Sequence, residues 1–213
     1  VESEFISLVS EPNYKRREMY ASLIQQAEQM RQGMSQAVKD AKGQSPSIAA
    51  TERAYLIRMG EIHAMLLRST GNAQKATGLE ERVLKFKQDR DWSDQKSKDL
   101  RISIPGTDEM IKEVIGGMGA MSEKQDQEFR KSMRALAVLV TDLYKIRGYL
   151  IQKAMKGEYS PLELAAAKPL LGSVSDSCLM LDTLNNELTK KGKPAVVVSD
   201  IGEDSDTIAL EIE

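Results

Sequence analysis

Apolar side chains recur every three or four residues along the N-terminal part of the chain. This spacing places them on one face of a helix and predicts a first long helix between Pro12 and Gly43. A second helix is predicted after Ser45, because Pro46 suits the first helical position. Its apolar stripe includes one charged residue, Glu52. The two helices are expected to form a hairpin closed by a short loop.

A third, shorter helix is predicted by the capping-box pair Thr77 and Glu80. Its apolar residues cover only two helical turns. From Lys85 to Arg101 the sequence is densely charged with both signs, and it contains the only tryptophan, Trp92. We interpret residues 87–106 as a charged, solvated connector between two helical regions.

The strongest helical pattern follows Ser122, which forms a capping-box pair with Gln125. The pattern predicts a long helix that ends near Lys156. Its apolar face consists of Phe129, Met133, Leu136, Val140 and Leu143, broadened by Leu139, Ile146 and Leu150. Leu136 and Leu143 lie seven residues apart on this face, so both are expected to be buried.

Two further helices flank this long one. A short helix is predicted from its cap at Thr107 to the glycines 116, 117 and 119, which we interpret as a flexible joint. The sequence Ser160-Pro161-x-Glu163 combines a cap, a proline at the first position and an acid in the first turn. It predicts a last helix that ends at Gly192, with a kink or a short break at Pro169.

The C-terminal segment has a different pattern: a short β-branched run, a turn, and alternating apolar residues. It predicts a β-hairpin. The predicted fold class is therefore all-α, with helical hairpins or a bundle of long helices, plus a small C-terminal β-hairpin. The predicted regions are an N-terminal helical hairpin (1–86), a charged connector (87–106), a C-terminal long helical hairpin (107–192) and an acidic β-hairpin or tail (193–213).

The composition, 41% hydrophobic and 29% charged, is that of a globular protein. The longest nearly apolar run, Ala135 to Val140, is far too short to cross a bilayer. We therefore expect a soluble protein without a membrane partner. Cys178 is the only cysteine, which excludes a disulfide within the chain and favours a cytoplasmic location.

The chain does not contain a recognisable catalytic or metal-binding pattern. His63 is the only histidine, so a multi-histidine metal site within one chain is excluded. Cys178 lies in an apolar helical stripe, where a buried and inert thiol is expected. The glycines at 116, 117 and 119 are not followed by the Gly-Lys-Ser/Thr of a phosphate-binding loop. We therefore expect a non-enzymatic protein without catalytic residues, metal ligands or cofactor.

The long helix is also the best candidate for nucleic-acid binding. Residues 123–156 contain eight cations and four acids. The candidate phosphate contacts are Arg130, Arg134, Lys145 and Arg147. Residues 199–213 carry six acids and no Lys or Arg, so this tail is able to compete for the same cations.

Two functions remain after these exclusions. The leading hypothesis is an assembly or adaptor protein that self-associates and docks protein partners through helix faces. The candidate interface residues are Met30, Met34, Trp92, Ile208, Leu210 and Ile212. The alternative is a nucleic-acid-binding accessory protein, of a packaging or replication type, with a basic helix and a regulatory acidic tail.

Overall fold

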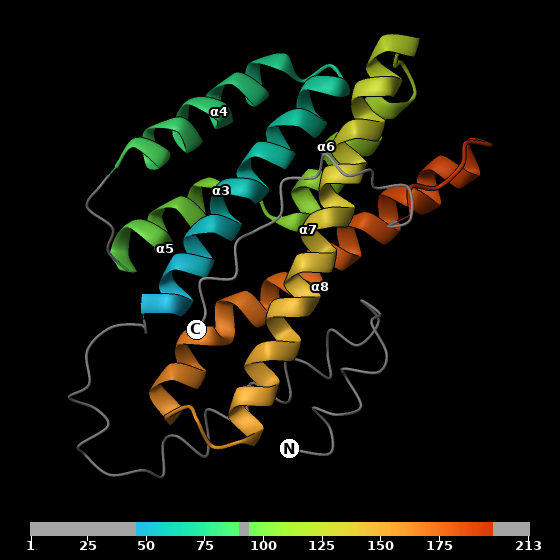
Figure 1. Ribbon diagram of the computed structural model, residues 1–213. Helices are drawn as coiled ribbons and strands as arrows, with labels where there is room; N and C mark the ends of the chain where they lie inside the picture. Colours follow the sequence, from blue (N-terminus) through green and yellow to red (C-terminus); the bar gives the residue numbers. More distant parts are fainter. Residues whose placement is uncertain (1–45, 90–93, 198–213) are drawn as a thin grey trace.

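The computed structural model describes residues 46–89 and 94–197, which are predominantly helical (Figure 1). The helices are α3 (Pro46–Ser69), α4 (Ala73–Gln88), α5 (Asp94–Ser103), α6 (Thr107–Met118), α7 (Glu123–Met155) and α8 (Pro161–Lys190). No β-strand occurs within these described residues. The predicted first helix and Trp92 lie outside them. So does the predicted β-hairpin, except for residues 193–197, which form no strand.

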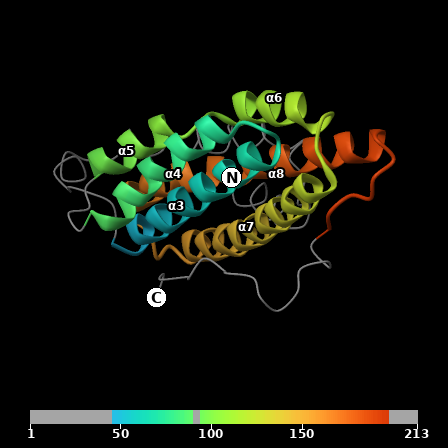
Figure 2. The ribbon, with the colours of Figure 1, turned by 90° about the horizontal axis from the view of Figure 1, so that it is seen from above.

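Helix α3 packs most extensively against α4 on one side and α7 on the other, as both ribbon views show (Figures 1 and 2). Helix α7 in turn packs against α8, and α6 packs mainly on α8. One continuous hydrophobic core joins these helices. Leu136 and Leu143 are fully buried in it, so their predicted burial is confirmed. Within the described ranges, no helix is both long and apolar enough to cross a membrane.

Local sequence determines where the two longest helices begin. The Ser122 hydroxyl accepts a hydrogen bond from the Gln125 amide at 3.3 Å, and the Gln125 side chain accepts one from the Ser122 amide at 2.9 Å. Ser160 and Glu163 form the same reciprocal pair at the start of α8, with Pro161 at its first position. Both predicted capping boxes are confirmed, and each satisfies backbone donors that a helix start leaves unpaired.

Helix α8 runs through Pro169 without the short break that the sequence suggested. A proline inside a helix removes one backbone donor and clashes with the carbonyl four residues earlier, a cost that other contacts of the helix must offset. Leu170 and Val174, which follow the proline, are buried. The Ser173 hydroxyl also donates a hydrogen bond to the Pro169 carbonyl at 2.8 Å.

The predicted start of the third helix is wrong by one turn. Helix α4 begins at Ala73, directly after Gly71 reverses the chain with a φ of 91°. Thr77 and Glu80 therefore lie inside the helix, where Arg68 donates hydrogen bonds to both side chains. The capping-box pattern failed because the tight turn after α3 leaves no room for a longer loop.

The solvated connector predicted at residues 87–106 is also wrong in part, because it contains α5. Ser97 and Leu100 are buried on α3 and α4, which both contact this helix. Lys98 and Asp99 are exposed on its outer face, whereas Arg101 pairs with the buried Glu52. The dense charge therefore concealed a short amphipathic helix. The division of the chain into domains at this segment stays a prediction.

At the end of α6, Gly117 makes a close contact where the sequence predicted a flexible joint. Helix α6 continues through Gly116 and Gly117 to Met118. Gly117 lies against the backbone of Thr70 at the end of α3, where a side chain has no room. The missing Cβ therefore allows α6 to approach α3 closely.

Candidate functional site

The segment after α8 folds back over the start of α7. Asp126 accepts a hydrogen bond from Arg130 Nε at 3.2 Å and forms an ion pair with Lys193. Arg130 Nη1 also donates to the carbonyl of Pro194 at 3.2 Å. The hydrogen bond from Lys193 lowers the pKa of Asp126, and the one from Arg130 acts in the same direction. The carboxylate of Asp126 therefore binds two cations from different parts of the chain, Arg130 on α7 and Lys193 after α8.

The amide side chain of Asn185 holds the same segment on α8. It donates to the carbonyl of Val196 at 2.9 Å and accepts from the amide of Val196 at 2.8 Å. The Val196 side chain is buried. These contacts bring the cations at the end of α8 beside those at the start of α7. We name this surface the basic end; it consists of Arg130, Arg134, Lys190, Lys191 and Lys193.

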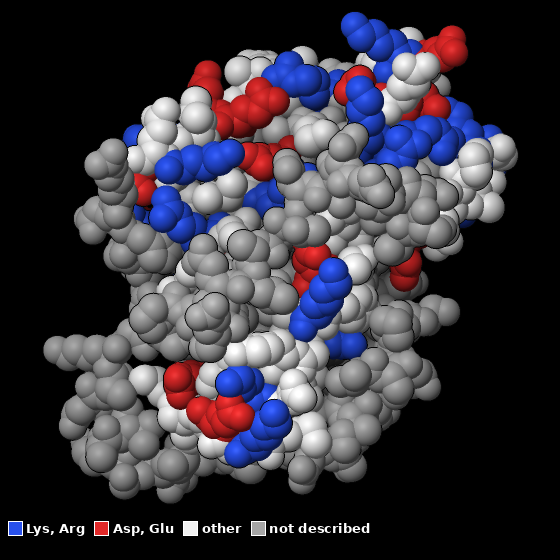
Figure 3. Space-filling model, in the orientation of Figure 1, with Lys and Arg blue, Asp and Glu red and all other residues white. Residues whose placement is uncertain are grey.

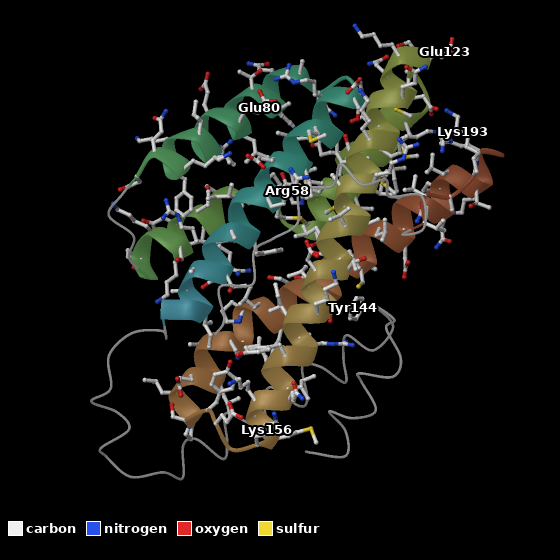
Figure 4. All side chains as sticks on the ribbon, viewed as in Figure 1. Arg58, Glu80, Glu123, Tyr144, Lys156 and Lys193 are labelled. Atoms are coloured by element: carbon white, nitrogen blue, oxygen red, sulfur yellow. The ribbon has the colours of Figure 1, made fainter. Side chains whose placement is uncertain are left out.

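Lys and Arg side chains gather over the basic end in the space-filling view (Figure 3). Figure 4 places Glu123 and Lys193 at this end of the molecule and Lys156 at the other. Lys190 forms an ion pair with Glu187. Among the described residues, Arg134 and Lys191 are exposed and form no ion pair. The spacing along α7 did not reveal the basic end, because three of its five cations come from the last residue of α8 and the segment after it.

The other two predicted phosphate contacts do not lie together. Lys145 is exposed, with its ammonium 3.7 Å from Asp142 Oδ1. Arg147 is only 3% exposed, and its guanidinium lies over the ring of Tyr144 at 4.4 Å from the centroid. Burial lowers the pKa of Arg147 to about 10, so it stays charged at neutral pH. Side chains two positions apart on a helix point in directions that differ by about 200°, which explains why Lys145 and Arg147 lie on opposite sides of α7.

Cys178 lies beside the same aromatic ring, with its thiol donating to Tyr144 Oη at 3.0 Å. The side chain is buried, as the sequence predicted. Burial raises the pKa of Cys178 to about 11, so the thiol is neutral at physiological pH. A neutral thiol is a poor nucleophile and metal ligand. Within the described ranges, no three metal-ligating side chains come together.

A small polar cavity of about 140 Å³ lies between α3, α5 and α8. Its lining includes Tyr55, His63, Arg101 and Asp176. Arg101 lies 5.7 Å from the ring centroid of Tyr55 and donates to Glu52 at 2.8 Å. This ion pair explains the charged residue on the apolar stripe of α3: the carboxylate of Glu52 is buried, and it pairs with a cation from α5.

His63 is the unusual member of this cavity. Its side chain is 2% exposed, and neither ring nitrogen has a hydrogen-bond partner in the described structure. Burial lowers the pKa of His63 from 6.5 to about 3. The buried imidazole is therefore neutral at physiological pH, as a core residue is expected to be.

We predict that this histidine makes the protein sensitive to mild acid. Because the pKa is lower in the folded state, the contribution of neutral His63 to stability is fully present above pH 6.5 and is lost as the pH falls toward 3. Between pH 7 and pH 5, the free energy of unfolding should fall by about 2 kcal/mol more in the wild type than in His63→Leu. Urea unfolding of both proteins measures this difference. Parallel pH profiles of the two proteins would contradict the prediction.

A larger groove of about 530 Å³ lies between α4 and α6. The chain between α5 and α6 closes one side of it. Ile102, at the rim, is 82% exposed, which is unusual for a large aliphatic side chain. We name this surface the α4–α6 groove. Sequence reasoning treated Ile102 only as part of a helix-breaking segment and missed its exposure; its neighbour Ile104, two residues away, is partly buried in the core.

Comparison of the chain with protein-family models, curated proteins and solved structures finds no significant match. Its function must therefore be inferred from its own surfaces. The basic end and the α4–α6 groove are two described surfaces with a composition suited to binding; a smaller groove of about 400 Å³ beside α4 includes the exposed Leu84. The polar cavity, at about 140 Å³, is small compared with the usual volume of ligand pockets.

Proposed function

We propose that the protein is a non-enzymatic assembly or adaptor protein that self-associates and docks protein partners through helix faces. The observation that carries this proposal is Ile102, which is 82% exposed at the rim of a groove of about 530 Å³. An exposed aliphatic side chain beside a partly apolar groove is typical of a protein interface, because association removes it from water. Leu79 and Met110 give the groove its apolar floor.

The proposal keeps the interface residues expected from the sequence, which lie outside the described residues: Met30, Met34, Trp92, Ile208, Leu210 and Ile212. The predicted first helix, between Pro12 and Gly43, and the predicted C-terminal hairpin are proposed to contribute these residues to partner interfaces. A cytoplasmic location belongs to the same proposal, since the single cysteine is a buried, free thiol.

Light scattering of the full chain tests the proposal. At tens of micromolar the wild type should have a mass above that of the 23.7 kDa monomer. Ile102→Ser should shift the protein toward the monomer, because the interface loses its exposed aliphatic anchor. Met155→Ser is the matched control, because Met155 is also exposed, at 42%, but lies at the end of α7, outside the α4–α6 groove. A wild-type protein that stays monomeric at every concentration contradicts the proposal.

The basic end supports a second candidate, nucleic-acid binding. Arg134 on α7 and Lys191, which directly follows α8, are exposed cations from distant parts of the chain, and the acidic residues 199–213 follow this surface closely in the chain. Phosphate groups release counterions when they bind such cations, so affinity falls with salt. The acidic tail is proposed to regulate binding by competing for the same cations. Arg147 is not part of this candidate site, because it is buried.

We predict that Arg134→Ala and Lys191→Ala each weaken binding to nucleic acid of any sequence. Each substitution should reduce the slope of log affinity against log salt by about one, the value for one lost phosphate contact. A gel-shift series at several salt concentrations measures the slope. Lys156→Ala, an exposed lysine at the opposite end of α7, serves as the control. If all three variants bind as the wild type does, the basic end is not a nucleic-acid site.

A further inference from the structure

The two walls of the α4–α6 groove carry opposite charges. Helix α4 contributes Lys75 and Arg82, whereas α6 contributes Glu109 and Glu113. Lys75 and Glu113 form an ion pair that joins the walls. The groove is therefore neutral as a whole, with a basic side on α4 and an acidic side on α6.

The other two charged residues of the groove, Arg82 and Glu109, do not form an ion pair with each other. Arg82 donates from Nε to the carbonyl of Gly78 at 3.0 Å and from Nη1 to the carbonyl of Ser103 at 2.9 Å. These partners fix the guanidinium in the groove without neutralising it. Glu109 is exposed on the opposite wall. Among the described residues, neither Arg82 nor Glu109 takes part in an ion pair.

We infer that the α4–α6 groove is a two-fold interface between two copies of this chain. A rotation about an axis parallel to the groove places the α4 wall of one copy over the α6 wall of the other. Arg82 then faces the partner's Glu109, and Glu109 faces the partner's Arg82. In a two-fold interface each copy offers the same patch, so one patch must carry both members of every complementary pair. This patch does, which favours a second copy over a partner with a single sign of charge.

The apolar and charged parts of the patch have different roles in this dimer. Ile102 loses its exposure to water when the second copy covers the groove, which supplies affinity. The pairs between Arg82 and the partner's Glu109 lie at the walls, where they fix orientation and disfavour other pairings. The inference rests on the proposed self-association and adds its geometry.

Two charge reversals test this geometry in the full chain. Arg82→Glu alone places two carboxylates opposite each other in both symmetry-related pairs, and Glu109→Arg alone places two guanidinium groups there. Each variant should dimerise at least about tenfold more weakly than the wild type, because like charges at an interface are costly. Sedimentation velocity over a concentration series measures the dissociation constants.

An equimolar mixture of the two variants is the decisive sample. A mixed pair joins the new carboxylate of one variant to the new guanidinium of the other, and it keeps one native pair between the unchanged Glu109 and the unchanged Arg82. The mixture should therefore regain a dissociation constant close to that of the wild type. Lys85→Glu and Asp108→Arg are matched controls, because they make the same charge changes on exposed residues of α4 and α6 that do not line the groove.

The outcomes separate this inference from the proposed function. If the wild type self-associates but neither reversal weakens it, or if the mixture does not recover, the two-fold groove interface is overturned and self-association stands. A wild type that is monomeric throughout overturns both. Circular dichroism verifies that each variant is folded. If a reversal unfolds the chain, Arg82→Gln and Glu109→Gln replace it; each should weaken dimerisation by a smaller factor, and no weakening overturns the inference.

Discussion

Replacing Leu143 by Ala is expected to lower the free energy of unfolding by about 2–5 kcal/mol. Leu143 is fully buried in the middle of α7, where this helix packs between α3 and α8. The substitution removes buried apolar surface and leaves a cavity that rigid helices on both sides cannot fill. Leu136→Ala should have an effect of the same size, because Leu136 is equally buried two turns earlier. Urea unfolding followed by circular dichroism measures both changes.

Leu84→Ala is the matched control, because Leu84 is 55% exposed on α4. Its stability should lie within about 0.5 kcal/mol of the wild type, as for most surface substitutions. If Leu136→Ala and Leu143→Ala left the unfolding transition unchanged, this face of α7 would not belong to the core, and the continuous core described above would be wrong.

The second large effect is expected at Gly117. A Cβ atom built on this residue would lie 2.6 Å from the Cβ of Thr70, and closer still to the Thr70 carbonyl oxygen. The nearest atoms include the Thr70 backbone carbonyl after α3, which cannot move away as the end of a flexible side chain can. Gly117→Ala should therefore lower the free energy of unfolding by about 3 kcal/mol, the cost of overpacking a well-filled contact. Thermal and urea unfolding both measure it.

Gly116 provides the control for this substitution within the same helical turn. A Cβ at Gly116 would meet nothing within 4 Å. Gly116→Ala should raise the free energy of unfolding by about 0.5–1 kcal/mol, because alanine loses less backbone freedom than glycine in a helix. A lower free energy of unfolding for Gly117→Ala and a higher one for Gly116→Ala would indicate a close helix contact at Gly117. If both substitutions stabilised the protein, α6 would not be held against α3 at this point.

Gly117 also bears on the proposed dimer, because α6 forms one wall of the α4–α6 groove. The contact with Thr70 sets the position of α6 relative to α3 and therefore the width of the groove. Gly117→Ala is expected to weaken self-association as well as stability, whereas Gly116→Ala should leave self-association unchanged. Light scattering of these two variants, at a temperature where both are folded, distinguishes the effects.

Helix positions were largely predictable from the sequence because they depend on neighbours a few residues apart. Ser122 and Ser160 begin their helices through hydrogen bonds to the third residue that follows. The apolar stripe of α7 predicted which leucines are buried, because the helical repeat alone decides which side chains share a face. Where a local pattern competed with tertiary packing, the prediction failed: Thr77 is not a cap, and α5 occupies part of the predicted connector.

The surfaces depend on contacts between segments far apart in the chain, so spacing could not reveal them. The basic end forms because Asp126 and Asn185 hold the segment after α8 on the start of α7. Arg147 is buried because its side of α7 faces inward, although its charge predicted a surface position. Ile102 is exposed because the last turn of α5 places it beside the α4–α6 groove, away from the core. Local propensity and periodicity determined the helices; only their packing decided which charges meet and which apolar side chains stay in water.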